Sequence, residues 1–334
     1  MVETHWVKPK TVFVTGGTGF VGAYVCRLLV ENGQIPIASG LDPFSAEALF
    51  MLGDSAKQID FVRADISDRE ATFASIKKAR PDAIIHSAGY VGHDASLADP
   101  ARAYDVNVGG TVNVLEAARK TGIQKVVLIS SNAAYHKRER DFFDETHPMT
   151  SISQGNPNAH YGTSKMAAEQ IGLTYFTFHN IDVMIVRITS VYGFGMKAGQ
   201  MALKQLVEAA VNGQEITIPT GGAVARDYTY VEETAAGIVD ILNMDSRTMH
   251  NRVFNISRGE LSSTFDIALA IRTIIPTASL TVGSEMTQFE QATLKQRVPL
   301  SWNAANKAFG YQSNYSIGDG IKKYIELYRK YREA

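Results

Sequence analysis

The chain has a single cysteine and almost no net charge, and each of these absences excludes a class of protein. Cys26 is the only cysteine among 334 residues, so no disulfide can form within the chain. It stands in an apolar stretch with Val21, Val25, Leu28 and Leu29, which predicts a core residue rather than a reactive thiol. Because 33 basic and 34 acidic side chains leave a formal charge of -1, no overall field attracts nucleic acid or an anionic membrane.

Long apolar runs and metal-ligand clusters are missing as well. No apolar run approaches the roughly 18 residues of a membrane span, and the first ten residues contain no apolar signal segment. The eight histidines show no close grouping with cysteines or carboxylates at metal-ligand spacing, so we predict no catalytic metal. These features, with an ordinary 45% hydrophobic content, favour a soluble cytoplasmic enzyme.

The first two-thirds of the chain alternates short β-branched runs with longer helical patterns. Strands are predicted over residues 11–15, 35–39, 60–63, 83–87, 125–130 and 183–188. Helices are predicted between them, near residues 20–32, 45–52, 68–79, 101–121 and 161–179. This alternation predicts an α/β fold with a Rossmann-type, doubly wound parallel sheet, and a ligand at the carboxyl ends of its strands.

After Ile188 the pattern changes to a glycine-containing segment and shorter elements. The predicted elements are helices near 201–212, 233–242 and 318–332 and strands at 216–218 and 253–256. We therefore expect a first domain over residues 9–187 and a smaller, interleaved α/β substrate lobe over most of 188–334. Segments near 227–257 are expected to pack back on the first domain.

A glycine-punctuated turn follows the first predicted strand and opens the first helix. Glycine permits unusual backbone angles there and leaves room where a Cβ would block a pyrophosphate. The amino end of the helix offers N–H donors and a partial positive charge to phosphate. We predict that residues 9–187 bind a nicotinamide dinucleotide, with its pyrophosphate held at Gly16, Gly19, Phe20, Val21 and Gly22.

An acidic residue about 20 positions after such a turn is expected to bind the ribose hydroxyls of NAD. Asp42 stands near that distance, although it is also suited to start the turn at Pro43. No lysine or arginine occurs between Arg27 and Lys57, which leaves no local cation for a 2′-phosphate, so NAD is predicted over NADP. Asp65, which precedes Ile66 after the third strand, is either an acceptor for the adenine amino group or a helix cap.

Tyr161 and Lys165 stand four residues apart at the start of a predicted helix, so their side chains share one helix face. That spacing alone is most typical of a surface pair. A lysine ammonium beside a phenol, however, favours the phenolate and lowers the tyrosine pKa. The strand of residues 125–130 runs into Ser130, Ser131 and Asn132, which places a hydroxyl at the carboxyl edge of the sheet. These residues together predict a proton-transfer site beside the nicotinamide.

Taken together, the motifs resemble those of an extended short-chain dehydrogenase/reductase, the NAD-dependent epimerase/dehydratase family. The resemblance runs from about Thr11 to the C-terminus. It is carried by residues 15–22, 65–68, 86–89, 107–111, 130–135, 161 with 165, 191–193 and 226–231.

The resemblance implies roles for the matched residues. Tyr161 is expected to be the acid/base, Lys165 to lower its pKa and bind the nicotinamide ribose, and Ser131 to hydrogen-bond the reacting oxygen. Ser131 is preferred to Ser130 because the family's serine stands four residues before the tyrosine matched by Tyr135. Relatives commonly pair through the helices matched by residues 101–121 and 161–179, so a homodimer is expected. Further cofactor contacts are expected at Ile66, Ser87, Ala88, Gly89 and Asn107, the last either supporting the site through the backbone or simply satisfied within its helix.

The residues after Ser131 indicate which reaction to expect. Family members that perform 4,6-dehydration carry an Asp-Glu pair there, and the decarboxylating type uses a glutamate at the same place. This chain has Asn132, Ala133 and Ala134 instead. The resemblance therefore implies reversible hydride transfer at a carbinol rather than 4,6-dehydration.

The substrate lobe carries signals of two kinds. Arg226 resembles the arginine that nucleotide-sugar enzymes place on a diphosphate, and a salt bridge with Asp227 is the structural alternative. Arg297 is a second candidate anion contact or a surface residue. Against a nucleotide, the family's usual asparagine and prolines are replaced by Ser190, Ile188 and Phe194, and Arg187 with Ser190 is an alternative holder of a small carboxylate.

The leading hypothesis is an NAD-dependent nucleotide-sugar epimerase with Tyr161 as acid/base. The alternative is an NAD(P)-dependent dehydrogenase or reductase of a small hydroxy acid, free sugar or sugar acid. A third class, a cofactor-sensing protein without turnover, conflicts with the intact Ser131, Tyr161 and Lys165. Besides these residues and Asn132, the loop residue His93 is expected to border the substrate, or to cap the following turn with Asp94.

Overall fold

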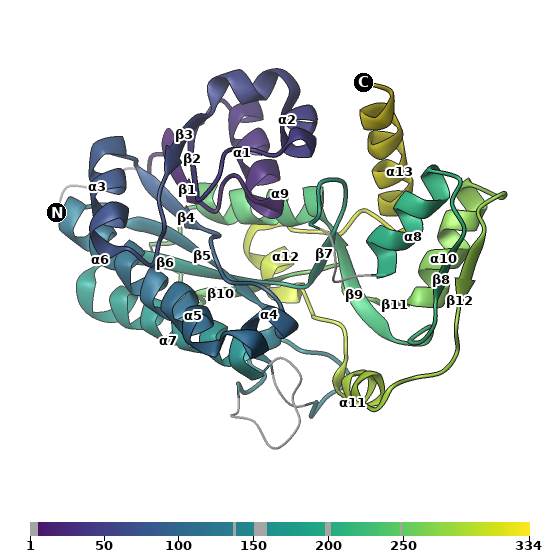
Figure 1. Ribbon diagram of the computed structural model, residues 1–334. Helices are drawn as coiled ribbons and strands as arrows, with labels where there is room; N and C mark the ends of the chain where they lie inside the picture. Colours follow the sequence, from purple (N-terminus) through teal and green to yellow (C-terminus); the bar gives the residue numbers. More distant parts are fainter. Residues whose placement is uncertain (1–5, 136–137, 150–158, 198–201, 248) are drawn as a thin grey trace.

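A seven-stranded parallel sheet forms the centre of the molecule (Figure 1). The computed structural model describes residues 6–135, 138–149, 159–197, 202–247 and 249–334. The strand order is β3-β2-β1-β4-β5-β6-β10. The chain adds its first strands on one side of β1 and its later strands on the other, and α/β sheets of this type bind ligands at that switch point between β1 and β4. The strands are β1 (Thr11–Thr15), β2 (Ile35–Gly40), β3 (Asp60–Arg63), β4 (Ala83–His86), β5 (Lys125–Ser131), β6 (Asp182–Ile188) and β10 (Val253–Ile256).

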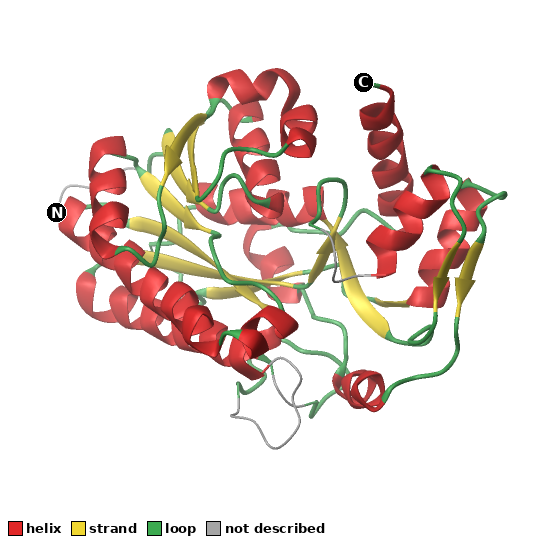
Figure 2. Cartoon of the chain, viewed as in Figure 1, coloured by secondary structure: helices red, strands yellow, loops and turns green. Residues whose placement is uncertain are grey.

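Helices cover both faces of this sheet, as Figure 2 shows. Because neighbouring residues of a strand point to opposite faces, Phe13 packs into one core cluster, and Val12 and Val14 pack into the other. The face of Phe13 is covered by α3 (Arg69–Ala79), α6 (Gly110–Thr121) and α7 (Ala159–His179). The opposite face is covered by α1 (Phe20–Glu31), α2 (Ala46–Leu52) with the 3-10 turn η1 (Gly53–Gln58), and α9 (Val231–Asn243).

The helix predicted over residues 101–121 is interrupted in the structure. It consists of α5 (Pro100–Tyr104), the π-helical turn η2 (Asp105–Gly109) and α6. The short helix α4 (His93–Ala98) precedes α5. A π-helical turn adds a residue to the helical circuit, and such turns are frequent at functional sites. Asn107 lies in the middle of this turn.

The rest of the chain forms a second lobe beside the carboxyl ends of the strands (Figure 1). One small sheet has the order β11-β9-β7 and another pairs β12 with β8. The elements of this lobe are β7 (Ser190–Tyr192), α8 (Ala202–Val211), β8 (Ile216–Ile218), β9 (Ala225–Tyr230), β11 (Leu261–Ser263), α10 (Thr264–Ile274), β12 (Leu280–Val282), α11 (Gln288–Gln296) and α13 (Ile317–Glu333).

The chain crosses between the two parts more than once. After β9 it returns through α9 to β10, which pairs in parallel with β6 in the central sheet. The helix α12 (Asn303–Phe309) then packs against β10 through Phe309 and Phe254, whose ring centroids lie 5.5 Å apart. One continuous core cluster includes Val12 of β1, Leu206 of α8 and Ile325 of α13, so both parts share a hydrophobic core.

The fold class and the burial of the single cysteine agree with the expectations from the sequence. The prediction of a Rossmann-type α/β fold is confirmed by the parallel sheet and its helical layers. Cys26 is fully buried within the larger core cluster, as its surroundings predicted. Across the described ranges, no helix is both long enough and apolar enough to cross a bilayer.

Candidate active site

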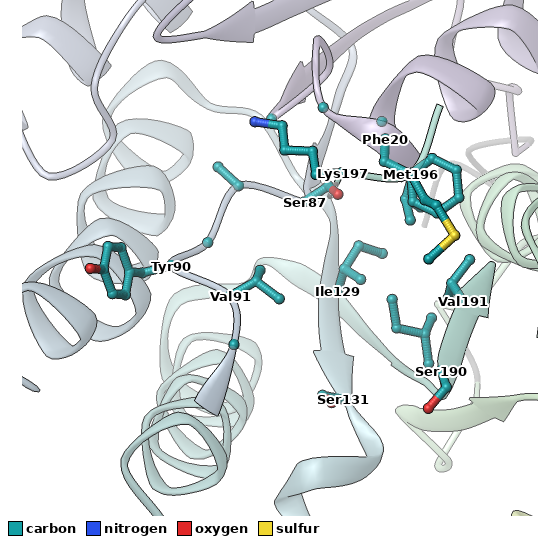
Figure 3. A pocket seen from close by; sticks show the side chains of 18 of the residues that line it. Phe20, Ser87, Tyr90, Val91, Ile129, Ser131, Ser190, Val191, Met196 and Lys197 are labelled. Atoms are coloured by element: carbon teal, nitrogen blue, oxygen red, sulfur yellow. The ribbon is translucent and has the colours of Figure 1, made fainter. Parts of the chain in front are cut away.

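A cavity of about 1670 Å³ lies at the carboxyl ends of the central strands. Figure 3 shows Tyr90 and Val91 on one side of it, Ser190 and Val191 on the other, and Ser131 at the end of β5 between them. Small-molecule pockets are usually about 300–1,000 Å³. The cavity is therefore large enough for a dinucleotide together with a second ligand.

The glycine turn forms the wall of this cavity that was predicted to hold a pyrophosphate. Gly16 has a φ of +65°, and a Cβ on it would lie 2.7 Å from the backbone nitrogen of Ala88. A Cβ on Gly22 would overlap the carbonyl oxygen of Gly16. No side chain caps α1 at Gly19, and N–H groups of a first helical turn have no carbonyl partner within the helix. The predicted contacts that line the cavity here are Gly16, Gly19, Phe20, Val21 and Gly22.

A buried chain of hydrogen bonds joins the start of this turn, at Thr15, to β4 and to the helix that carries Thr111. Thr111 donates its hydroxyl proton to the carbonyl of Asn107 at 2.7 Å, so its oxygen accepts from His86 Nε2 at 3.2 Å. That arrangement leaves His86 Nδ1 to accept from the Thr15 hydroxyl at 2.7 Å. The Thr15 oxygen in turn accepts the N–H of Ala88. Burial lowers the pKa of His86 to about 3, with a further lowering from Lys165, so the ring is neutral.

The two predicted acidic cofactor contacts both line the cavity but differ in their surroundings. Asp42 is exposed, two residues beyond the end of β2 at Gly40. Asp65 accepts hydrogen bonds from the backbone and hydroxyl of Ser67, and its Oδ2 lies 2.7 Å from Arg102 Nη2. It does not cap the next helix, because the side chain of Asp68 does so.

The predicted contacts after β4 lie next to the glycine turn, since a Cβ on Gly16 would meet the backbone of Ser87 and Ala88. Ile66, Ser87, Ala88 and Gly89 line the cavity. Asn107 is 2% exposed and holds the segment after them in place. Its Oδ1 accepts the N–H of Tyr90 at 2.7 Å, and its Nδ2 donates to the Tyr90 carbonyl and to the hydroxyl of Ser164 at 2.9 Å. The side chain of Asn107 thus joins this loop to α7, and the π-helical turn positions it.

Ser131, Tyr161 and Lys165 come together at one end of the cavity, as the sequence predicted. Tyr161 and Lys165 lie one turn apart at the start of α7, and Ser131 ends β5. The Ser131 hydroxyl accepts the N–H of Ala133 at 3.1 Å and lies 3.3 Å from Asn132 Oδ1, and, against the effect of burial, its interaction with the Tyr161 side chain lowers the pKa of that tyrosine. The neighbouring Ser130 donates its hydroxyl to Glu169 instead. Adjacent residues of a strand point to opposite faces, which accounts for the different partners of the two serines.

The pKa values at this site depart from the simple expectation for a tyrosine beside a lysine. Burial raises the pKa of Tyr161, and the hydrogen bond with Ser131 opposes that rise. Lys165 Nζ donates to the carbonyl of Ile129 at 2.7 Å, and burial lowers its pKa to about 8. The nearby carboxylate of Glu169 favours the charged lysine and limits this fall.

Two arginines, Arg226 of β9 and Arg297 after α11, line the cavity in the second lobe. Within the described ranges neither makes a salt bridge, so the alternative pairing of Arg226 with Asp227 is not found. Arg297 is half-buried, and burial together with the charge of Arg226 lowers its pKa to about 9. Its Nε is buried without a hydrogen-bond partner. This end of the cavity therefore offers two guanidinium groups to an anion.

The remaining substrate predictions have mixed outcomes. Asn132 and Ser190 line the cavity, whereas the side chain of His93, at the start of α4, lies outside the described residues. The hypothesis that Arg187 holds a small carboxylate substrate is wrong. Its side chain is 3% exposed, and its Nη2 lies 2.6 Å from Glu169 Oε2. Burial of that ion pair beneath the cavity leaves no guanidinium surface for a ligand.

Sequence reasoning missed several residues of the site. Met196 and Lys197, which follow β7, also line the cavity (Figure 3). They follow the Val-Tyr-Gly motif of residues 191–193, and no periodic pattern in the sequence indicated that they line the cavity. His86 belonged to a matched motif but was not given a role. Glu169 stands four residues after Lys165, and that helical spacing was the available signal for it.

Comparisons with known proteins agree with this geometry. Residues 12–257 match the NAD dependent epimerase/dehydratase family, and the chain belongs to that family. It is 30% identical over 264 residues to a putative UDP-glucose 4-epimerase of Methanocaldococcus jannaschii, covering 77% of this chain and 80% of the relative. It is 25% identical over 322 residues to a UDP-glucuronate 4-epimerase of Thermodesulfobacterium geofontis, covering 93% and 94%. The family resemblance and NAD as the cofactor are thereby confirmed.

Solved structures share the fold at lower identity. The UDP-glucose 4-epimerase of Thermus thermophilus, in complex with NAD, superposes with a TM-score of 0.79 at 24% identity, covering 96% of this chain and 99% of that one. A dTDP-glucose 4,6-dehydratase of Bacillus anthracis, also in complex with NAD, has a TM-score of 0.78 at 21% identity and covers 97% of each chain. The fold is thus common to epimerases and dehydratases, and it does not decide between them.

Proposed function

We propose that this protein is an NAD-dependent nucleotide-sugar epimerase. The observation that carries the proposal is the pair Arg226 and Arg297, which lines the same cavity as Ser131 and Tyr161. Two guanidinium groups without a carboxylate partner suit a doubly charged diphosphate, whose oxygens guanidinium binds in a bidentate manner. The names of its relatives, UDP-glucose and UDP-glucuronate 4-epimerases, support the same substrate class.

The residues of the site divide the work of such a reaction. Tyr161 takes the hydroxyl proton of the sugar carbinol as it is oxidised and returns a proton when the ketone is reduced on its other face. Ser131 orients the reacting oxygen, and Lys165 supplies a buried positive charge. Asn132 and Ser190 contact the sugar, and His93 is proposed to border it. NAD, when bound, supplies the reversible hydride acceptor that the reaction needs.

We propose further that the enzyme does not catalyse 4,6-dehydration. Elimination of water needs an acid and a base beside the sugar. The positions after Ser131 hold Asn132, Ala133 and Ala134, and the 3-10 turn η3 (Asn132–Ala134) carries no carboxylate. The buried state of Arg187 also counts against the alternative of a dehydrogenase acting on a small carboxylate.

Epimerisation can be tested directly on the purified protein. Incubation with UDP-glucose or UDP-glucuronate is expected to give a mixture of 4-epimers by proton NMR, without net accumulation of NADH. Tyr161→Phe is expected to lower turnover about 10²–10⁴-fold while leaving NAD affinity unchanged. Absence of both epimer exchange and nucleotide-sugar binding would overturn the proposal. Steady NADH production from hydroxy acids or free sugars would support the dehydrogenase instead.

The wider organisation of the enzyme is proposed on the same basis. Residues 9–187 bind NAD, most of 188–334 binds the sugar nucleotide, and segments near 227–257 pack back on the first domain. A homodimer formed through α6 and α7 in the cytoplasm is proposed, and the exposed Phe178 of α7, 74% accessible, supports such an interface. Analytical ultracentrifugation of the wild type and Phe178→Glu tests it, because a monomeric wild type would contradict the proposal.

A further inference from the structure

A buried ion pair, formed by Glu169 and Arg187, includes a residue of the helix that carries Tyr161 and Lys165. Glu169 of α7 and Arg187 of β6 are 1% and 3% exposed. Arg187 Nη2 lies 2.6 Å from Glu169 Oε2, and its Nε lies 3.0 Å from Oε1, so the contact is bidentate. Burying two charges costs about as much free energy as their attraction returns, so such a pair is weak evidence of a stabilising role.

The pair is fixed by hydrogen bonds from two other elements. Ser130 of β5 donates its hydroxyl to Glu169. Arg187 Nη1 donates to the hydroxyl of Tyr135 at 2.7 Å, and Tyr135 donates to Asn255 of β10 at 2.9 Å. The carboxylate of Glu169 therefore has little freedom, and it ties the end of β5, next to Ser131, to the helix that carries Tyr161 and Lys165.

Glu169 also follows Lys165 by four residues, so the two side chains are neighbours on α7. Among the residues that the structure describes, the other groups that face Lys165 are not anionic. They are Tyr161 on α7, the neutral ring of His86 on β4 and the carbonyl of Ile129 on β5. Glu169 is the neighbouring charge that favours the ammonium form, against a strong burial effect.

We propose that Glu169, held by Arg187 and Ser130, is a positioning residue that stabilises the ammonium form of Lys165 and fixes Ser131 against α7. The inference deepens the proposed function, because it concerns the cation that assists Tyr161. Loss of the carboxylate then changes the pH range in which Lys165 is charged. A pair that served only to pack β6 against α7 would leave that range unchanged.

The charge state of Lys165 can be measured without any substrate. Carbon-13 NMR of protein labelled in lysine, assigned with Lys165→Arg, gives the titration midpoint of Lys165, expected near 8 in the wild type. In Glu169→Gln we expect the midpoint to fall by about one pH unit or more, because an attractive charge is replaced by an amide. The alkaline limit of epimerase activity is expected to fall with it, and Glu169→Asp is expected to retain most of the wild-type midpoint.

Glu169→Gln leaves Arg187 buried without a partner and is at risk of unfolding. The double variant Glu169→Gln/Arg187→Met removes both charges and keeps the volume filled. We expect it to show a smaller fall of the midpoint in the same direction. The matched control is Asp182→Asn, which disrupts another buried network, with Lys125 and Arg252, at the opposite end of β6. It is expected to lower stability without moving the midpoint of Lys165.

An unchanged Lys165 midpoint in the folded double variant and in Glu169→Gln would overturn the proposal, as would an equal fall in Asp182→Asn. A failure of the proposed function gives a different result. In that case the wild type exchanges no epimers, whereas the NMR titration still decides whether Glu169 controls Lys165.

Discussion

Asp227 accepts the backbone N–H of Leu300 at 3.0 Å, and this bond joins β9 to the segment that follows Arg297. Arg226 precedes Asp227 on the strand, so the two side chains point to opposite faces. Both residues line the cavity, and the carboxylate of Asp227 also anchors the loop that carries the second arginine. The two guanidinium groups therefore share a cavity wall because one carboxylate holds their segments together.

This carboxylate makes stability depend on pH in an unusual direction. Burial raises the pKa of Asp227 to about 7, above its value of 3.8 in an unfolded chain. The native state thus binds more protons than the unfolded state between about pH 4 and 7, and the free energy of unfolding falls as pH rises through that window. Asp227→Asn is expected to flatten this dependence in urea denaturation at pH 5 and pH 7. Asp54→Asn, at an exposed surface pair, serves as the control.

Replacement of either cavity arginine is expected to weaken nucleotide binding. Arg226→Met and Arg297→Met each remove a guanidinium from the proposed diphosphate site, so we expect UDP to bind about 10–100-fold more weakly by calorimetry. NAD affinity is expected to stay unchanged. Arg119→Met, at an exposed pair with Glu116, is the matched control. Unchanged UDP affinity in both cavity variants would contradict the assignment.

The glycine turn leaves no space for a side chain at Gly22. A methyl group there would overlap the carbonyl of Gly16, so Gly22→Ala is expected to displace the turn and weaken NAD binding more than tenfold. The measurement is fluorescence titration with NADH, accompanied by circular dichroism. Gly318→Ala, in the first turn of α13, meets only ordinary contacts and should bind as the wild type does. Equal affinities for all three proteins would refute this reading of the turn.

Asp42 is proposed to select NAD over NADP. Its exposed carboxylate at the cavity wall is suited to accept ribose hydroxyls and to repel a 2′-phosphate. We expect Asp42→Asn to weaken NAD binding about tenfold and to narrow the preference over NADP, both measured by calorimetry. Glu47→Gln, which removes another carboxylate from the same cavity lining, tests whether the effect is only one of general charge.

The sequence was most informative where periodicity was strong. The strands at residues 11–15, 60–63, 216–218 and 253–256 have the predicted bounds, because β-branched or aromatic residues there stand out from the polar segments beside them. Three short strands were missed, namely β7, β11 and β12, whereas the equally short β8 was predicted from its β-branched Ile-Thr-Ile sequence. The π-helical turn at Asp105–Gly109 was also missed, because it lies within a continuous helical stretch and differs from the α-helix in its backbone hydrogen bonds.

For the site, motif order predicted which residues line the cavity but not how they pair. Arg187 was interpreted as a substrate ligand because its partner Glu169 stands 18 residues earlier on another element. Likewise, Ser130 and Ser131 are chemically identical in the sequence, and only the alternation of the strand separates their partners. Pairings of this kind depend on sheet register and helix rotation, which local patterns do not encode.

The return of the chain to the central sheet has a consequence for dissecting the protein. Because β10 pairs with β6 in the central sheet, the second lobe is assembled from chain segments that lie both before and after a strand of the first part. A fragment that stops at residue 188 would expose the backbone of β6 as a bare apolar edge, the kind of edge that recruits other chains. Because the two parts also share one hydrophobic core, they are best exchanged or engineered together.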